Sequence, residues 1–126
     1  MLLICGVPHS GKTTLANYLS SDVKHTDDCM HLGWSEQSDE VSRWLDGTAD
    51  IEGVTLPRAL RKWLDRNNTG IPAKSILFLG SPIPRYSLKG QQSMADNCWT
   101  VFLEILPQLV ARGSTITMVK NAIEYT

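Results

Sequence analysis

The chain carries the pattern G-x-x-x-x-G-K-[ST] at residues 6–13, where the letters are G-V-P-H-S-G-K-T. An apolar run precedes the pattern at 1–5, and a run typical of a helix follows it at 13–20. A buried strand, a glycine loop and a helix N-terminus form the setting in which this pattern cradles phosphate groups. Gly6 and Gly11 permit backbone angles that let successive N–H groups point at one anion. The pattern therefore predicts a nucleotide-phosphate site between a strand and a helix.

The polar residues of this loop have distinct expected roles. Lys12 would reach the β- and γ-phosphates of ATP, and the Thr13 hydroxyl would ligate Mg²⁺. The helix that begins near Lys12 directs the positive end of its dipole at the same anion. His9 stands where a smaller residue is more usual, and we expect it to line the loop. The residues expected to bind the nucleotide here are Gly6, His9, Ser10, Gly11, Lys12, Thr13 and Thr14.

The rest of the chain alternates strand patterns with helix patterns. Candidate strands cover 1–5, 22–26, 49–54, 75–79 and 115–119, and candidate helices cover 13–20, 35–47, 56–66 and 91–111. This alternation predicts an α/β fold with a mostly parallel sheet. The strand at 22–26 has few apolar residues, so we expect it near the sheet edge. Trp34 is expected in a loop, and 120–126 as a tail.

Length and composition favour one small globular domain, 1–126. The chain has 126 residues, of which 42% are hydrophobic and 20% charged, as in folded domains. A formal net charge of −1 provides no basic field for a nucleic-acid backbone, so nucleic acid is not an expected partner. No apolar run approaches the roughly 18 residues of a membrane span. The three cysteines have no metal-binding spacing, which is typical of reduced thiols in a cytoplasmic protein.

Three carboxylates follow candidate strands, at the edge where such sheets bind ligands. A phosphoryl-transfer site needs carboxylates to support Mg²⁺ and to orient the attacking hydroxyl. Asp27 or Asp28 is placed to face an acceptor, and Glu52 to support the metal or its water shell. The alternatives are a solvated turn or helix cap for the aspartates and a surface loop for Glu52. The catalytic candidates are Lys12, Asp27, Asp28 and Glu52, and the metal-ligand candidates are Thr13, Asp28 and Glu52.

Other polar and aromatic side chains leave two interpretations open. Four cations can contact phosphate or can be solvated surface charges: Arg58, Arg61, Arg85 and Lys89. His25 and His31 are expected as turn or surface histidines. Trp34 is close to Asp28 in the sequence and is expected either to pack in the core or to stack on a substrate.

Four segments in order resemble the P-loop small-molecule kinases, the group that includes uridine, shikimate, nucleoside-monophosphate and zeta-toxin-like kinases. They are G-V-P-H-S-G-K-T at 6–13, T-D-D at 26–28, I-E-G-V at 51–54 and R-A-L-R at 58–61. The resemblance spans essentially the whole chain, but only the first motif is highly specific. It implies a three-layer P-loop NTPase fold, with a five-stranded sheet in the order 2-3-1-4-5 and helices on both faces.

The resemblance also implies roles for individual residues. The acid after strand two, Asp27 or Asp28, would face the acceptor, and Glu52 after strand three would serve the metal. Arg85 and Lys89 would be the cations of a lid over the phosphates, and adenine would lie near Asn121. The compact layout is also similar to small ATP-binding proteins encoded by bacteriophages, which would place the protein in the host cytoplasm.

Two functions are consistent with these patterns. The first is a kinase that uses Mg²⁺ and transfers the γ-phosphate of ATP to a small molecule or a nucleotide. The second is a nucleotide-binding or slowly ATP-hydrolysing regulatory protein that acts on a protein partner. A closed acceptor cleft lined by Asp27, Asp28 and Arg58 would favour the kinase, whereas an exposed apolar patch without a cleft would favour the regulator.

Overall fold

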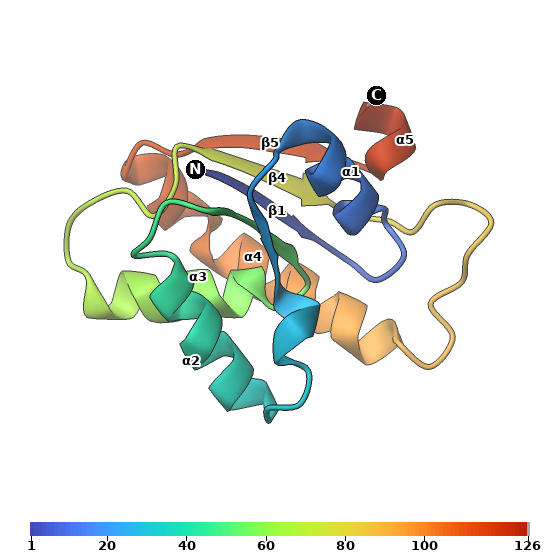
Figure 1. The fold of residues 1–126 in the computed structure, drawn as a ribbon, viewed down its shortest axis with the longest axis horizontal. Coiled ribbons are helices and arrows are strands. Elements are labelled where there is room, and N and C mark those ends of the chain that lie inside the picture. The colour runs from blue at the N-terminus through green and yellow to red at the C-terminus, as the bar shows by residue number, and fades with distance from the viewer. Residues whose placement is uncertain (126) are drawn as a thin grey trace.

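The central sheet holds the five strands found in residues 1–125, the part of the chain that the computed structural model describes (Figure 1). The strands are β1 (Leu2–Gly6), β2 (Val23–His25), β3 (Asp50–Gly53), β4 (Ser75–Leu79) and β5 (Thr115–Val119). All pairs are parallel, and the order is β2-β3-β1-β4-β5. The expected α/β architecture and strand order are therefore confirmed, with β2 at an edge as its thin apolar content predicted.

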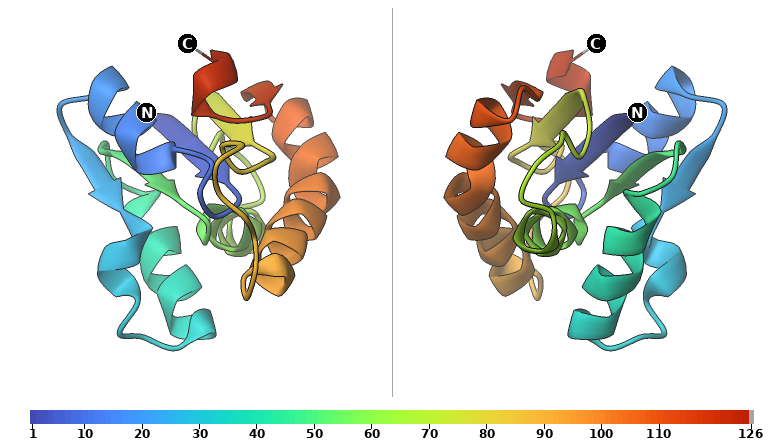
Figure 2. Two further views of the ribbon diagram at one scale, coloured as in Figure 1. Left: turned by 90° about the vertical axis from the view of Figure 1, so that its right-hand side faces the viewer. Right: turned by 90° about the vertical axis from the view of Figure 1, so that its left-hand side faces the viewer.

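Helices cover both faces of this sheet (Figure 2). They are α1 (Lys12–Leu19), α2 (Trp34–Trp44), α3 (Leu56–Arg66), α4 (Gln92–Ala111) and α5 (Ala122–Tyr125), with a 3₁₀ helix η1 (Thr26–Cys29) after β2. Because side chains alternate along a strand, Leu3 and Cys5 join the larger core with α2, α3 and α4, and Ile4 faces α1. In the larger core, the rings of Phe78 and Phe102 stack with centroids 4.3 Å apart.

Two segments differ from the sequence-based expectations. Trp34 is the first residue of α2 and not part of a loop, since the extended backbone of Gly33 already occupies the N-cap position. The expected tail contains the short helix α5, because Asn121 Oδ1 accepts a hydrogen bond from the Glu124 N–H at 3.1 Å. Glu124 Oε2 in turn accepts one from the Lys120 N–H at 2.9 Å. These two reciprocal bonds satisfy N–H groups that the start of a helix leaves free.

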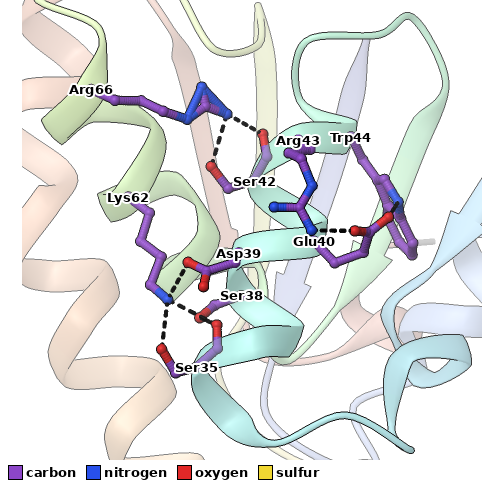
Figure 3. Close-up of polar contacts among 9 residues, drawn as sticks. All are labelled: Ser35, Ser38, Asp39, Glu40, Ser42, Arg43, Trp44, Lys62 and Arg66. Atoms are coloured by element: carbon purple, nitrogen blue, oxygen red, sulfur yellow. Dashed lines mark hydrogen bonds and ion pairs between the residues drawn. The ribbon is translucent and has the colours of Figure 1, made fainter.

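The α2 helix is held against α3 by long cationic side chains (Figure 3). Lys62 Nζ lies 2.7 Å from Asp39 Oδ1 and donates to the Ser35 carbonyl at 2.9 Å. One turn further along α3, Arg66 donates to the Ser42 carbonyl at 2.7 Å. Since Ser35 is in the first turn of α2, these contacts also fix the position of Trp34, which precedes it.

The carboxyl ends of the strands meet at one edge of the sheet. Cys5 of β1 is in register with Gly53 of β3, and Gly6 with Leu79 of β4. His25 of β2 is in register with Glu52. The loop at residues 6–13, called the phosphate-binding loop after the motif that predicts its role, leaves the sheet at this edge together with η1 and the loop after β4 (Figure 1). Sheets of this type bind ligands at this edge.

Candidate functional site

A cleft of about 670 Å³ opens at the carboxyl edge of the sheet. One half is formed by the phosphate-binding loop and the first turn of α1, including Pro8, Lys12 and Thr13. The other half is formed by η1, the start of α2, the end of β3 and the start of α4. The cleft volume is in the range of small-molecule sites, and the cleft extends well beyond the phosphate-binding loop itself.

The phosphate-binding loop has the curvature of an anion cradle. Gly11 has φ of +92°, and a Cβ at that position would lie 2.6 Å from Ala122 Cβ, so only glycine fits. The Ser10 carbonyl accepts a hydrogen bond from the Ala122 N–H at 2.9 Å, which fastens the loop to the start of α5. Within residues 1–125 no side chain caps the N-terminus of α1. The N–H groups of its first turn are therefore available to an anion.

Lys12 holds its ammonium inside this cradle. Its Nζ donates to the Val7 carbonyl at 2.8 Å, and it forms no ion pair with any carboxylate of the described residues. Burial lowers the pKa of Lys12, and the nearby Glu52 carboxylate is the main influence in the opposite direction. A phosphate bound in the loop would be an anionic partner for this ammonium.

Thr13 and Glu52 meet at the floor of the cleft. The Thr13 hydroxyl donates to Glu52 Oε2 at 2.6 Å, and His25 Nδ1 lies 3.3 Å from the same oxygen. Glu52 is only 1% exposed, so the alternative of a surface loop was wrong. His25 ends β2 beside this carboxylate, so it is not in a turn, but 28% of its side chain is exposed and it is therefore partly at the surface, as expected.

This pair of oxygen-bearing side chains fits Mg²⁺. Oε1 of Glu52 accepts no hydrogen bond from residues 1–125, while Oε2 is held by Thr13 and His25. Across the same residues, no three His, Cys, Asp or Glu side chains gather into a metal cluster. Mg²⁺ is commonly held by one or two protein oxygens together with nucleotide phosphates and water, so such a cluster is not needed.

Glycine at position 53 brings β3 and η1 into direct contact. A Cβ on Gly53 would overlap Thr26 Oγ1, and the backbone there has φ of +152°. Thr26 is 2% exposed, and its Oγ1 has no hydrogen-bond partner within the described part of the chain. This contact places Asp27, the next residue of η1, in the lining of the same cleft as Glu52.

The half of the cleft beyond the phosphate-binding loop is mainly apolar. Trp34 lies in its wall, with the Arg58 guanidinium 5.7 Å from the centre of the indole ring. Gln37 also lines this half, and its amide is oriented by a hydrogen bond to the Leu32 carbonyl at 3.0 Å. Asp27 is the carboxylate in this half. The other lining residues here are Met30, Leu32, Gly33, Val54, Thr55, Gln91 and Met94.

The loop between β4 and α4 lies against the phosphate-binding loop. The Ile83 N–H donates to the His9 carbonyl at 2.8 Å. The Tyr86 and His9 rings stack with centroids 5.1 Å apart, and the Arg85 guanidinium lies 5.2 Å from the centre of the Tyr86 ring. Arg85 and Tyr86 both line the cleft. The loop thus carries a cation to the phosphate side of the site.

Seven residues considered for the site in the sequence are not part of the cleft lining among residues 1–125: Gly6, Ser10, Asp28, Arg58, Arg61, Lys89 and Asn121. Asp28 is exposed on η1, next to the lining residue Asp27, and Lys89 is exposed in the loop after β4. Asn121 is buried and caps α5. Arg58 lies over the ring of Trp34, which does line the cleft. The structure therefore distinguishes the two aspartates, which their adjacent positions in the sequence did not.

Gln37 and Tyr86 line the cleft although the sequence did not single them out. Gln37 occurs one turn after Trp34 on α2, and Tyr86 directly follows Arg85. Both are therefore close in the sequence to residues that were already candidates for the site. The sequence did not show the direction in which each segment leaves the sheet.

The chain matches no protein-family model, no curated protein and no solved structure. Among residues 1–125, no helix is both long enough and apolar enough to cross a membrane. The function is therefore argued from the chemistry of the cleft, because a fold alone does not determine an activity.

Proposed function

We propose that this protein is a kinase of the P-loop NTPase type that transfers the γ-phosphate of ATP to a small molecule or a nucleotide. The observation that carries the proposal is the 2.6 Å contact between the Thr13 hydroxyl and Glu52, at the floor of a cleft that continues to Asp27. A phosphate-binding loop alone would support nucleotide binding. The additional room beside a free carboxylate supports a second substrate.

The phosphate half would bind ATP through groups that the fold leaves without strong partners. The free N–H groups at the start of α1 would receive the phosphate oxygens. Lys12 would exchange its bond to the Val7 carbonyl for bonds to the β- and γ-phosphates. Arg85 would add positive charge from the loop after β4. These donors stabilise the negative charge on the transferring group, which is the main requirement of phosphoryl transfer.

Thr13 and Glu52 are the residues that would hold Mg²⁺. When bound, Mg²⁺ neutralises charge on the β- and γ-phosphates. Glu52 contributes a carboxylate whose orientation is fixed before the nucleotide arrives, since Thr13 and His25 already contact it. Asp28, also predicted as a ligand, lies outside the cleft lining among the described residues and is given no role here.

The acceptor half would supply the base and exclude water. The Asp27 carboxylate would accept the proton of the attacking hydroxyl as its oxygen bonds to the γ-phosphorus and the bond from that phosphorus to the ADP oxygen breaks. Trp34, Met30 and Met94 would cover the apolar part of the acceptor. The alternative function, a regulatory protein that acts on a partner, needs no acceptor half, so the presence of this half of the cleft favours the kinase.

The free, buried cysteines among the described residues support a reducing, cytoplasmic location.

An acceptor screen tests this proposal. ATP consumption is measured with Mg²⁺ in the presence of nucleosides, nucleotides and small metabolites bearing hydroxyl or phosphate groups. We expect at least one acceptor class to stimulate consumption in the wild type and not in Lys12→Ala. ATP binding without stimulation by any acceptor would favour the regulatory alternative, and absence of ATP binding would refute both.

A further inference from the structure

We propose that His25 is a positioning residue, which orients the Glu52 carboxylate for the cation of the nucleotide complex. The inference rests on the proposed function and extends it to a residue outside the cleft lining. His25 would not touch ATP or the acceptor. It would act by holding one oxygen of Glu52 so that the other remains available.

The sheet itself brings the two side chains together. His25 and Glu52 are register partners on the parallel strands β2 and β3, so their side chains project from the same face. Thr13 reaches that face from the first turn of α1. Side chains from two other elements thus converge on Oε2 of Glu52, with Thr13 Oγ1 at 2.6 Å and His25 Nδ1 at 3.3 Å.

Two contacts are needed because a glutamate side chain is not oriented by its own torsions. The last torsion of glutamate is broad, so a single hydrogen bond leaves the carboxylate free to turn about that bond. A second donor from a different direction removes this freedom. Glu52 has 2% of its side chain exposed, so water provides little further restraint, whereas His25 is 28% exposed and lies on the outer side of the pair.

The chemistry of the contact determines which nitrogen of His25 holds the Glu52 carboxylate. The Glu52 oxygen is the acceptor, so the contact is a hydrogen bond in the His25 tautomer that has its proton on Nδ1. Donors that hold a metal-binding side chain in place typically change metal affinity by about 10–100-fold when they are removed. His25 should therefore affect how much Mg²⁺ the protein needs, and affect metal-free nucleotide binding little.

The test compares His25→Asn with His25→Leu. The two replacements have nearly the same shape, but only asparagine can place an N–H donor where Nδ1 stands. Binding of a fluorescent ATP analogue is measured over a range of Mg²⁺ concentrations, and thermal unfolding is measured without nucleotide. We expect the leucine variant to need about tenfold more Mg²⁺ for half-maximal binding, and the asparagine variant to stay within about threefold of wild type. If the leucine variant does not fold, His25→Ala takes its place.

The outcomes separate this inference from the proposed function. If wild type binds the analogue in a Mg²⁺-dependent way and the leucine variant has the same Mg²⁺ dependence, the inference fails and the proposed function stands. Equal losses in the leucine and asparagine variants would also overturn it, because the N–H donor would then not be the cause. If wild type does not bind the analogue at all, the proposed function itself fails.

Discussion

The Thr13 hydroxyl and Glu52 Oε2, 2.6 Å apart, join the first turn of α1 to the end of β3. Since β3 lies directly beside β1, this bond fastens the helix that follows the phosphate-binding loop to the neighbour of the strand that precedes it. The side chains of the site are therefore held in place by the fold itself, and each can be tested by a single substitution.

Replacing Lys12 with methionine should weaken ATP binding strongly and stabilise the nucleotide-free protein. Burial lowers the pKa of Lys12, so the charged form costs free energy in the folded state that a buried methionine does not. Because the folded pKa lies below the unfolded one, this cost is complete below the folded pKa and disappears as pH rises toward the unfolded value of about 10.4. Calorimetry with ATP and denaturant unfolding at neutral and alkaline pH measure the two effects. A methionine variant less stable than wild type at neutral pH would contradict the prediction.

Glu52→Gln should raise the Mg²⁺ requirement while leaving the fold in place. The amide keeps the size of the side chain and can still accept from Thr13, but it loses the negative charge that favours a cation. We expect at least about a tenfold loss of Mg²⁺-dependent nucleotide affinity, measured by titration at fixed nucleotide. Asp39→Asn, which removes an exposed carboxylate on α2, is the control and should leave that affinity unchanged.

Asp27→Asn and Asp28→Asn should have different effects although the residues are adjacent. Asp27 lines the cleft, and Asp28 is not among its lining residues within 1–125. Loss of a positioned base typically costs about 10²–10⁴ in rate, so we expect that loss in acceptor-stimulated turnover for Asp27→Asn only. ATP affinity should change little in both variants. Equal turnover of the two variants would exclude Asp27 as the base.

Tyr86→Ser should loosen the loop between β4 and α4. The variant removes the ring that stacks on His9 and that lies beside Arg85. Stacked aromatic pairs contribute about 0.5–1.5 kcal/mol, which corresponds to a loss of roughly two- to tenfold in ATP affinity if the loop must stay docked. Limited proteolysis within 80–91 should become faster. The control is Tyr18→Ser, because Tyr18 is 81% exposed on α1. Unchanged proteolysis of the Tyr86 variant would show that the stack does not hold the loop.

The sequence predicted the sheet well because its strands have strong local signals. The apolar runs before Gly6 and at 75–79 predicted buried strands. The glycine-rich motif predicted that a helix follows the first of them. The strand order came from the family resemblance. Thr13 and Glu52 were each predicted as metal ligands, and their direct contact follows from the position of β3 beside β1.

The parts of the site that depend on segment direction could not be predicted in the same way. The two aspartates are separated by one step of the 3₁₀ helix η1, and its orientation is set by packing of Thr26 against Gly53. Likewise, His25 became relevant only through its register with Glu52, which requires the sheet order and the exact alignment of two short strands. Neither the orientation of η1 nor the register of β2 with β3 has a local sequence signal.

The contact between Gly53 and Thr26 also determines how this cleft can be redesigned. The separation of Glu52 from Asp27 depends on the contact of the Gly53 backbone with the Thr26 side chain, and any side chain at position 53 would force the two segments apart. A larger or smaller acceptor therefore has to be accommodated elsewhere. The flexible side chains of Met30, which follows η1, and Met94 of α4 also line the cleft, and unbranched methionines repack readily. Selection for new acceptors should accordingly accumulate substitutions at those two positions while leaving glycine at 53.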